Sequence, residues 1–128
     1  MILFDVLDVL EQYVILHPMM QHVITILDRS LPYEMADGLY DCPECDALKY
    51  KIETFVTSKG IPVEHKEGFF TLEITLRGDQ LVSFEVPQAV YHLTGGRFLL
   101  TDQDYKRAIA PNLTSEIKTV QFYLPFLK

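Results

Sequence analysis

Residues 63–79 read VEHKEGFFTLEITLRGD, and the second half of this stretch decides the fold class. From residue 70 to residue 77 apolar and polar side chains alternate strictly. Successive side chains of a β-strand point to opposite faces, so the pattern predicts a strand with one apolar face. The apolar set is Phe70, Leu72, Ile74 and Leu76, and the polar set is Thr71, Glu73, Thr75 and Arg77.

The chain beyond residue 30 is punctuated by Pro and Gly, and its apolar period is two. Strands of this kind need a second sheet to cover their apolar face, which predicts a β-sandwich, barrel or jelly roll. We expect a tight hairpin turn at Gly78-Asp79, a bend at Gly95-Gly96 and a polar loop over 108–115. The predicted strands are 49–57, 69–77, 81–86, 97–101 and 116–124, with a weaker one at 38–41.

The N-terminal region has helical spacing instead. Asp5 is placed to cap a first helix, and Pro18 suits the first position of a second helix. The buried stripes would be Val6, Val9, Leu10 and Tyr13, then Met19, Val23, Ile26 and Leu27. The fold class is therefore mainly β (α+β), as one domain over 1–128 with a helical segment at 1–29 and a β-barrel at 38–125.

Composition narrows the classes of function. Of the 128 residues 48% are hydrophobic, which predicts a folded globular domain. The net charge is −7 and no stretch concentrates Lys and Arg, so nucleic acid is not an expected partner. Asp5, Asp8 and Glu11 interrupt the N-terminal apolar residues, so we expect neither a signal peptide nor a membrane span, and a cytoplasmic location.

The motif Cys42-Pro43-Glu44-Cys45 has zinc-knuckle spacing. A closed zinc site needs two more ligands, and a redox motif usually begins a helix, whereas this one falls between predicted strands. We interpret it as an incidental turn. The triplet Asn112-Leu113-Thr114 matches a glycosylation site but is interpreted as a loop.

Glu64 and His65 form the most interesting pair, because a carboxylate and an imidazole can hold a metal or relay a proton. Thr71 and Glu73 would converge on the same space if their strand face lines a barrel. A solvated loop followed by a solvated strand face is the other interpretation, and the pattern leaves both open.

The order of short motifs along the chain resembles the YhcH/YjgK/YiaL family, which includes the β subunit of the evolved β-galactosidase. The resemblance spans nearly the whole chain. The motifs are an opening Met-Ile, two short helices around Tyr13 and Pro18, Gly38-Leu-Tyr-Asp, Phe55-Val-Thr-Ser-Lys59, Glu64-His65, Leu76-Arg-Gly-Asp79 and Gly96-Arg-Phe98.

The resemblance implies a cupin-like double-stranded β-helix and a role in sugar catabolism, in some members as sugar isomerases. The family's site combines a Glu-x-His pair, an Asp and a Gln on the next strand, and a later loop with a second His. In this chain the corresponding positions are Glu64, Lys66 (with His65 one place away), Thr71 and Glu73, then Asp104 and Lys106 in the later loop. Because Thr and Lys replace an acid and a histidine, the resemblance implies a degenerate site for a divalent metal, with metal binding weak or absent.

Two functions follow as hypotheses. The first is a sugar isomerase, epimerase-like enzyme or sugar-binding protein, in which Glu64 or Glu73 moves a proton and His65, with Glu64, is the metal ligand or acid–base partner. Thr71, Asp104, Lys106 and Phe55 would contact the sugar. The second is a non-catalytic subunit like the β-galactosidase β chain, docked on a partner or on its own copy as a homodimer through the apolar tail 122–127.

Overall fold

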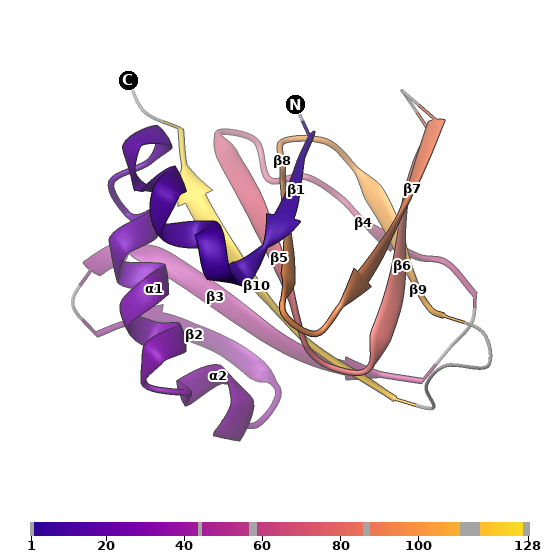
Figure 1. Ribbon diagram of the computed structural model, residues 1–128, viewed down its shortest axis with the longest axis horizontal. Coiled ribbons are helices and arrows are strands. Elements are labelled where there is room, and N and C mark those ends of the chain that lie inside the picture. Colours follow the sequence, from indigo (N-terminus) through magenta and orange to yellow (C-terminus); the bar gives the residue numbers. More distant parts are fainter. Residues whose placement is uncertain (1, 44, 57–58, 86–87, 111–115, 127–128) are drawn as a thin grey trace.

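The computed structural model describes residues 2–43, 45–56, 59–85, 88–110 and 116–126. Its strands form a six-stranded sheet in the order β1-β8-β5-β10-β3-β2 and a four-stranded sheet in the order β4-β9-β6-β7. Every pairing is antiparallel, and the sheets face each other beside a small group of helices (Figure 1). The strands are β1 Ile2–Val6, β2 Gly38–Cys42, β3 Cys45–Phe55, β4 Ile61–Val63, β5 Phe69–Arg77, β6 Asp79–Glu85, β7 Gln88–Thr94, β8 Arg97–Thr101, β9 Tyr105–Ile109 and β10 Ile117–Pro125. The helices are η1 Leu7–Leu16, α1 Met20–Asp28 and α2 Leu31–Glu34.

Strand β5 has the alternation that its sequence predicts. Leu72 and Ile74 are fully buried on the face that the helices cover, together with Met20, Val23 and Phe122. Thr71, Glu73 and Thr75 are also buried, on the face toward the four-stranded sheet. The polar side of this strand is therefore an interior surface of the sandwich.

The turn at Gly78 is not the predicted hairpin. β5 belongs to the six-stranded sheet and β6 to the four-stranded one, so Gly78 carries the chain from one sheet to the other. Its φ of 85° lies in the left-handed region, which glycine adopts without a Cβ clash. Gly96, with φ of 87°, is at the same kind of crossing between β7 and β8.

The N-terminus differs from its prediction. Ile2–Val6 is a strand paired with β8, so the N-terminal 29 residues are not wholly helical. Asp5 is not a helix cap: its carboxylate accepts a hydrogen bond from the Tyr13 hydroxyl at 2.5 Å and from the Val6 backbone amide at 2.8 Å. The segment after it, η1, is a 3₁₀ helix.

Helix α1 begins at Met20, two residues after Pro18, and buries Met20, Val23 and Ile26 against the six-stranded sheet. The side chain of His17 fixes the approach to this helix. Its Nδ1 accepts the Met19 amide at 3.1 Å, so its Nε2 donates to the Pro125 carbonyl, 2.6 Å away. This contact ties the helices to the last strand.

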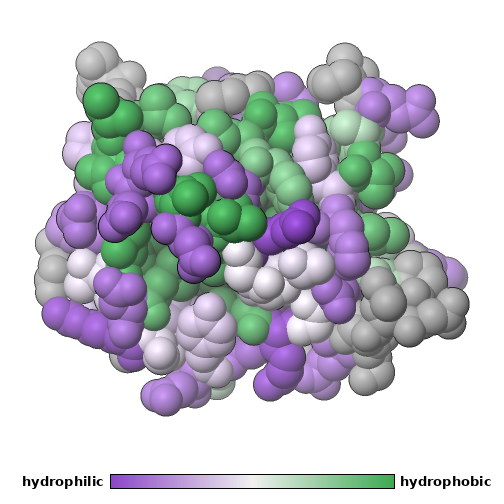
Figure 2. All heavy atoms as spheres, viewed as in Figure 1, coloured by the Kyte–Doolittle hydropathy of each residue, from purple (hydrophilic) through white to green (hydrophobic). Residues whose placement is uncertain are grey.

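The apolar residues form two clusters. The larger lies between the helices and the six-stranded sheet and contains Phe122 and Leu124 of the C-terminal tail, so these two residues are covered by the chain's own core. The smaller lies between the two sheets and is built around Val82, Phe84 and Tyr105. No helix in the described ranges is long and apolar enough to cross a membrane. The face in Figure 2 shows hydrophobic and hydrophilic residues interspersed.

Besides β1, three described strands were not predicted: β4, β7 and β9. β4 spans only three residues, and β7 carries apolar Val90 on its exposed face. β9 begins at Tyr105 and reaches Ile109, so the loop expected over 108–115 was wrong for its first two residues. Asn112–Thr114 lie outside the described residues.

Candidate functional site

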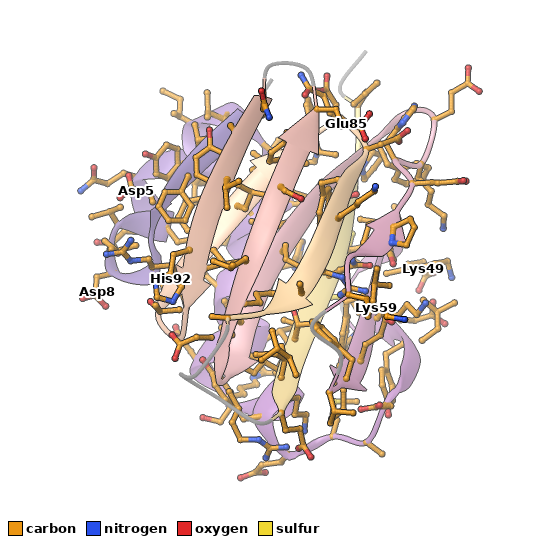
Figure 3. The ribbon with its side chains drawn as sticks, turned by 90° about the vertical axis from the view of Figure 1, so that its right-hand side faces the viewer. Asp5, Asp8, Lys49, Lys59, Glu85 and His92 are labelled. Atoms are coloured by element: carbon orange, nitrogen blue, oxygen red, sulfur yellow. The ribbon has the colours of Figure 1, made fainter. Side chains whose placement is uncertain are left out.

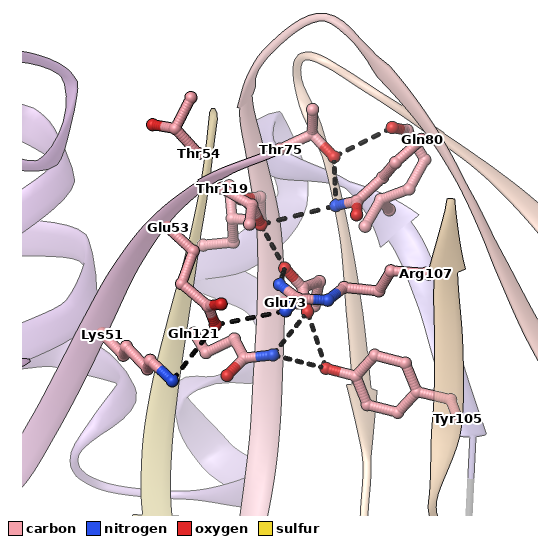
Figure 4. A network of polar contacts seen from close by, with 12 residues as sticks. Lys51, Glu53, Thr54, Glu73, Thr75, Gln80, Tyr105, Arg107, Thr119 and Gln121 are labelled. Carbon is pink, nitrogen blue, oxygen red and sulfur yellow. Dashed lines mark hydrogen bonds and ion pairs between the residues drawn. The ribbon is translucent and has the colours of Figure 1, made fainter. Parts of the chain in front are cut away.

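A buried carboxylate, Glu73, is the centre of a polar network inside the sandwich (Figure 4). The Tyr105 hydroxyl donates to its Oε1 at 2.7 Å and the Gln121 amide at 2.9 Å. The Thr119 hydroxyl donates to Oε2, and Arg107 Nη1 lies 3.4 Å from the same oxygen. Four donors from β9 and β10 thus surround one acid from β5.

Arg107 is the cation of this network and joins it to the edge of the sandwich. Its Nη2 donates to Glu53 Oε1 at 3.1 Å, and its guanidinium lies 5.3 Å from the centre of the Phe55 ring. Burial alone would lower the pKa of Arg107, but Glu73 and Glu53 outweigh it and raise that pKa overall. The guanidinium therefore stays charged between two carboxylates.

Two tyrosines hold their protons here. Burial, and then the charge of Glu73, raises the pKa of Tyr105 well above its ordinary value. Burial, followed by the charges of Glu53 and Glu73, raises the pKa of Tyr123 to about 12. The Tyr123 hydroxyl donates to Gln121 Oε1 at 2.9 Å, which turns the Gln121 amide nitrogen toward Glu73.

Gln80 extends the network toward β6. Its amide donates to Thr75 Oγ1 at 2.8 Å, and the Thr75 hydroxyl donates to the Leu93 carbonyl at 2.9 Å. Within the described part of the chain, two buried side-chain atoms have no hydrogen-bond partner, Gln80 Oε1 and Arg107 Nε. The interior is therefore polar and nearly, but not wholly, satisfied.

A second feature is an open cavity of about 840 Å³ beside the four-stranded sheet. We call it the rim cavity, because its walls come from the ends of β4, β6, β7 and β9 and from the loops that follow β4 and β8. Figure 3 looks onto this sheet, with Glu85 near the top of the view and His92 at the lower left. The residues that line the cavity include Glu64, His65, Phe84, Asp104, Tyr105 and Lys106.

His65 and Asp104 are paired at the wall of the rim cavity. Asp104 Oδ1 lies 2.5 Å from His65 Nδ1 and accepts the His65 backbone amide at 2.8 Å. The side-chain hydrogen bond to Asp104 raises the pKa of His65, and the hydrogen bond from the His65 backbone amide lowers the pKa of Asp104. The backbone contact fixes the carboxylate relative to the ring, so Nδ1 of the imidazole is engaged with Asp104. Nε2 does not take part in this pair.

Three further charged residues at the rim cavity, Glu64, Glu85 and Lys106, are exposed, and Asp102 is half-buried. Lys106 Nζ lies 3.9 Å from Glu85 Oε1, and Glu64 precedes His65 on the same loop. Ser83 and Phe84 line the same wall, with the Phe84 side chain 3% exposed. Acidic, basic and hydroxyl groups therefore meet in one space of small-molecule size.

The sequence-predicted residues fall into three places. Glu64, His65, Asp104 and Lys106 are brought together at the rim cavity. Thr71 and Glu73 lie inside the sandwich, where they are 2% and 0% exposed and do not line that cavity. Phe55 stacks near Arg107 at the edge of the interior.

Sequence reasoning missed the partners of Glu73. Arg107 lies in a stretch that was assigned to no strand, and Thr119 and Gln121 were treated only as part of a strand. Part of the signal was present: 117–121 places Thr119 and Gln121 two apart, on one strand face, whereas 105–109 reads Tyr-Lys-Arg-Ala-Ile and shows no alternation. A second strand with a polar face, in addition to the strand that carries Glu73, was the available indication of a polar interior.

The residues present do not fit a tight divalent metal site. Asp104 is bonded to His65, and Glu73 has the guanidinium of Arg107 as its cation. Within the described residues no three His, Cys, Asp or Glu side chains are grouped so as to hold a metal ion.

Comparisons with known proteins identify the fold. No family model and no curated protein matches this sequence. A cupin protein from Bacteroides fragilis superposes with a TM-score of 0.58 at 14% identity, covering 72% of this chain and 78% of that one. The cupin domain of an XRE family transcriptional regulator from Enterobacter cloacae superposes with a TM-score of 0.54 at 7% identity, covering 73% and 100%.

The cobalt(II) form of HppE in complex with Tris buffer is also similar, with a TM-score of 0.54 and 12% identity. The match covers 70% of this chain but 52% of HppE. At such identities the likeness concerns the fold alone. The chain has the cupin jelly-roll fold, which confirms the predicted fold class.

Proposed function

We propose that the rim cavity binds a small polyhydroxylated molecule of the sugar class and that His65 is its acid–base group. One observation carries this proposal: His65 Nδ1 lies 2.5 Å from Asp104 Oδ1 at the wall of a cavity of about 840 Å³. An imidazole oriented by a carboxylate has its second ring nitrogen available to exchange a proton with a ligand.

The composition of the cavity supports a polyol ligand. Small-molecule sites have volumes of roughly 300–1,000 Å³ and combine apolar walls with a few convergent polar groups. Here Phe84 and Tyr105, each 3% exposed, form an apolar layer behind the wall, and Ser83, Glu64 and Lys106 supply the polar groups. Hydroxyl, carboxylate and ammonium groups can bond the oxygens of a sugar.

The reaction class that these groups suit is the movement of a proton next to a sugar carbonyl, as in an isomerase or epimerase. His65 would take the proton from carbon, Lys106 would stabilise the enediolate oxygen that forms, and His65 would return the proton. Glu64 stands beside His65 as a second carboxylate for the sugar hydroxyls. The resemblance to the YhcH/YjgK/YiaL family, with its members in sugar catabolism, points in the same direction.

Deuterium exchange tests both parts of the proposal. The protein is incubated in D₂O with a panel of aldoses and ketoses, and incorporation of deuterium at carbon is followed by NMR. We expect enzyme-dependent incorporation for at least one sugar, its loss in His65→Gln, and no change in His22→Gln, a histidine on α1 outside the cavity. Equal incorporation by the wild type and His65→Gln would refute the role of His65. If a sugar raised the melting temperature of the protein but gave no deuterium exchange, the protein would bind that sugar without catalysing proton transfer.

A non-catalytic subunit is the second candidate, and a specific surface favours it. Ile15, Leu16 and Phe126 are 89%, 51% and 45% exposed. The hydrogen bond from His17 to the Pro125 carbonyl brings the end of η1 next to the end of β10, where these side chains lie. An exposed apolar group of this kind suits a second copy of the chain.

Sedimentation measures this second candidate directly. We expect a dimer at micromolar concentrations that Ile15→Ser weakens, with the exposed Leu39→Ser on β2 as the matched control. A strict monomer across that range would remove the homodimer.

A further inference from the structure

The Cys42/Cys45 motif lies at the tip of the β2–β3 hairpin. Cys42 ends β2, Cys45 begins β3, and the two residues are register partners. The register shifts between Asp41 and Cys42, so the two cysteines face each other at the irregular end of the antiparallel pair. A disulfide needs Cα atoms roughly 4.4–6.8 Å apart, a separation that residues facing each other across two strands can reach.

Both side chains belong to one side of the hairpin. Cys42 is a member of the larger apolar cluster, and Cys45 packs against the same cluster. Their Cβ atoms therefore point to a shared environment, as a bond between the two sulfur atoms requires.

The two thiols differ in access. Cys42 is 3% exposed, whereas Cys45 is partly exposed, and both are free thiols. A reagent in solution meets Cys45 first, while Cys42 is shielded from solvent but opposite Cys45. This asymmetry separates an attacking thiol from a resolving thiol.

A metal does not account for the pair. Zinc bound through two thiolates needs two further ligands, and the described residues offer no group of three metal-binding side chains. The pair also makes none of the contacts that build the rim cavity, so its chemistry is independent of the proposed function.

We propose that Cys42 and Cys45 are a reversible dithiol–disulfide pair that reacts with low-molecular-weight disulfides of the glutathione class. The Cys45 thiolate attacks one sulfur of the small disulfide, forms a mixed disulfide and releases one small thiolate. The Cys42 thiolate then attacks the Cys45 sulfur, forms the Cys42–Cys45 bond and releases the second small thiolate. The two protein thiols lose two electrons, the small disulfide gains them, and the two thiol protons end on the released thiols.

The product ties edge strand β2 to β3 at the end of their hairpin. Only two residues separate the cysteines in sequence, so the closed loop is short and its effect on unfolding is small. The main consequence is protection: an exposed mixed disulfide or sulfenic acid at Cys45 is resolved before it accumulates.

Three proteins test the order of events: the wild type, Cys42→Ala and Cys45→Ser. Alanine keeps the buried position apolar, and matching thermal unfolding curves in reducing buffer establish that each variant is folded. Each protein is reduced, incubated in the folded state with glutathione disulfide, and its intact mass is measured without reductant.

We expect the wild type to lose the mass of two hydrogen atoms with no lasting glutathione adduct, and a dithiol to reverse the loss. Cys42→Ala should accumulate one adduct on Cys45, and Cys45→Ser should remain unmodified. A stable adduct on the wild type, a wild type that stays reduced where Cys42→Ala is modified, or modification of Cys42 in Cys45→Ser would each overturn the proposal. Stoichiometric zinc in the reduced protein that is lost in both variants would overturn it as well.

Discussion

The guanidinium of Arg107 on β9 lies 3.4 Å from the carboxylate of Glu73 on β5, across the inside of the sandwich. Their side chains are 3% and 0% exposed. A buried pair of this kind stabilises a fold only while both partners are present, because either charge alone is stranded without water. The interior of this cupin fold is thus occupied by a cation of the protein itself.

Removal of Arg107 should therefore be costly. We expect Arg107→Met to lower the free energy of unfolding by about 3–5 kcal/mol, because it leaves Glu73 buried without its cation. Urea unfolding followed by circular dichroism measures this change.

Arg77 provides the matched control, since its ion pair with Glu116 is exposed on both sides. Arg77→Met should lower the free energy of unfolding by about 1 kcal/mol or less. Equal effects of the two substitutions would contradict the account of the interior pair.

The titration of His65 gives the second prediction. The hydrogen bond to Asp104 raises the pKa of His65 above its ordinary value of 6.5. The stability that this pair contributes is therefore full below pH 6.5 and is lost as the pH rises through the raised pKa of His65. At the acid end it is lost again as the pH falls through the pKa of Asp104, which lies below 3.8.

NMR titration of the His65 ring measures the shift. Asp104→Asn should lower the pKa of His65 toward 6.5, whereas Asp79→Asn, a carboxylate beside His92, should leave it unchanged. A His65 titration insensitive to Asp104→Asn would show that the pair is not formed in solution.

The C-terminal tail contains one buried and one partly exposed phenylalanine, Phe122 and Phe126. Phe122 is fully buried, so Phe122→Ala should lower the free energy of unfolding by about 3–5 kcal/mol. Phe126 is 45% exposed, and its ring centroid lies 4.6 Å from that of Phe70. Phe126→Ala should therefore lower the free energy of unfolding by about 1 kcal/mol. Thermal unfolding of the two variants ranks them, and a larger loss for Phe126→Ala would mean that the tail packs differently.

The sequence predicted the strands whose two faces differ in polarity or that bury an apolar face on the helices. Phe69–Arg77 and Arg97–Thr101 have their predicted bounds, and 116–124 is close to the observed Ile117–Pro125. The N-terminal strand was missed because Ile2, Leu3 and Phe4 pack into clusters on both faces, which removes the period of two. The turn at Gly78 was misassigned because a tight turn between strands does not reveal whether they share a sheet.

Only part of the candidate site was predicted, because the sequence shows which residues are polar but not which distant residues pair with them. His65, Asp104 and Lys106 stand at strand ends and keep their polar chemistry visible in the sequence. The network around Glu73 depends on residues 32 to 48 positions away, and only tertiary pairing brings Tyr105 and Gln121 to one carboxylate. Periodicity places Glu73 on the polar face of its strand but cannot show that this face is interior, or that the partners of Glu73 are an arginine, a tyrosine and two neutral side chains.

The central claim is that the rim cavity, and not the buried interior, meets the ligand. Two-dimensional ¹H–¹⁵N NMR spectra recorded during a titration with sugars test it directly. The account predicts saturable shifts for the amides of His65, Asp104, Tyr105 and Lys106, with Lys49 and Leu39 on the remote hairpin unmoved. Shifts confined to the helices or to that hairpin, or none with any sugar at millimolar concentration, would contradict it.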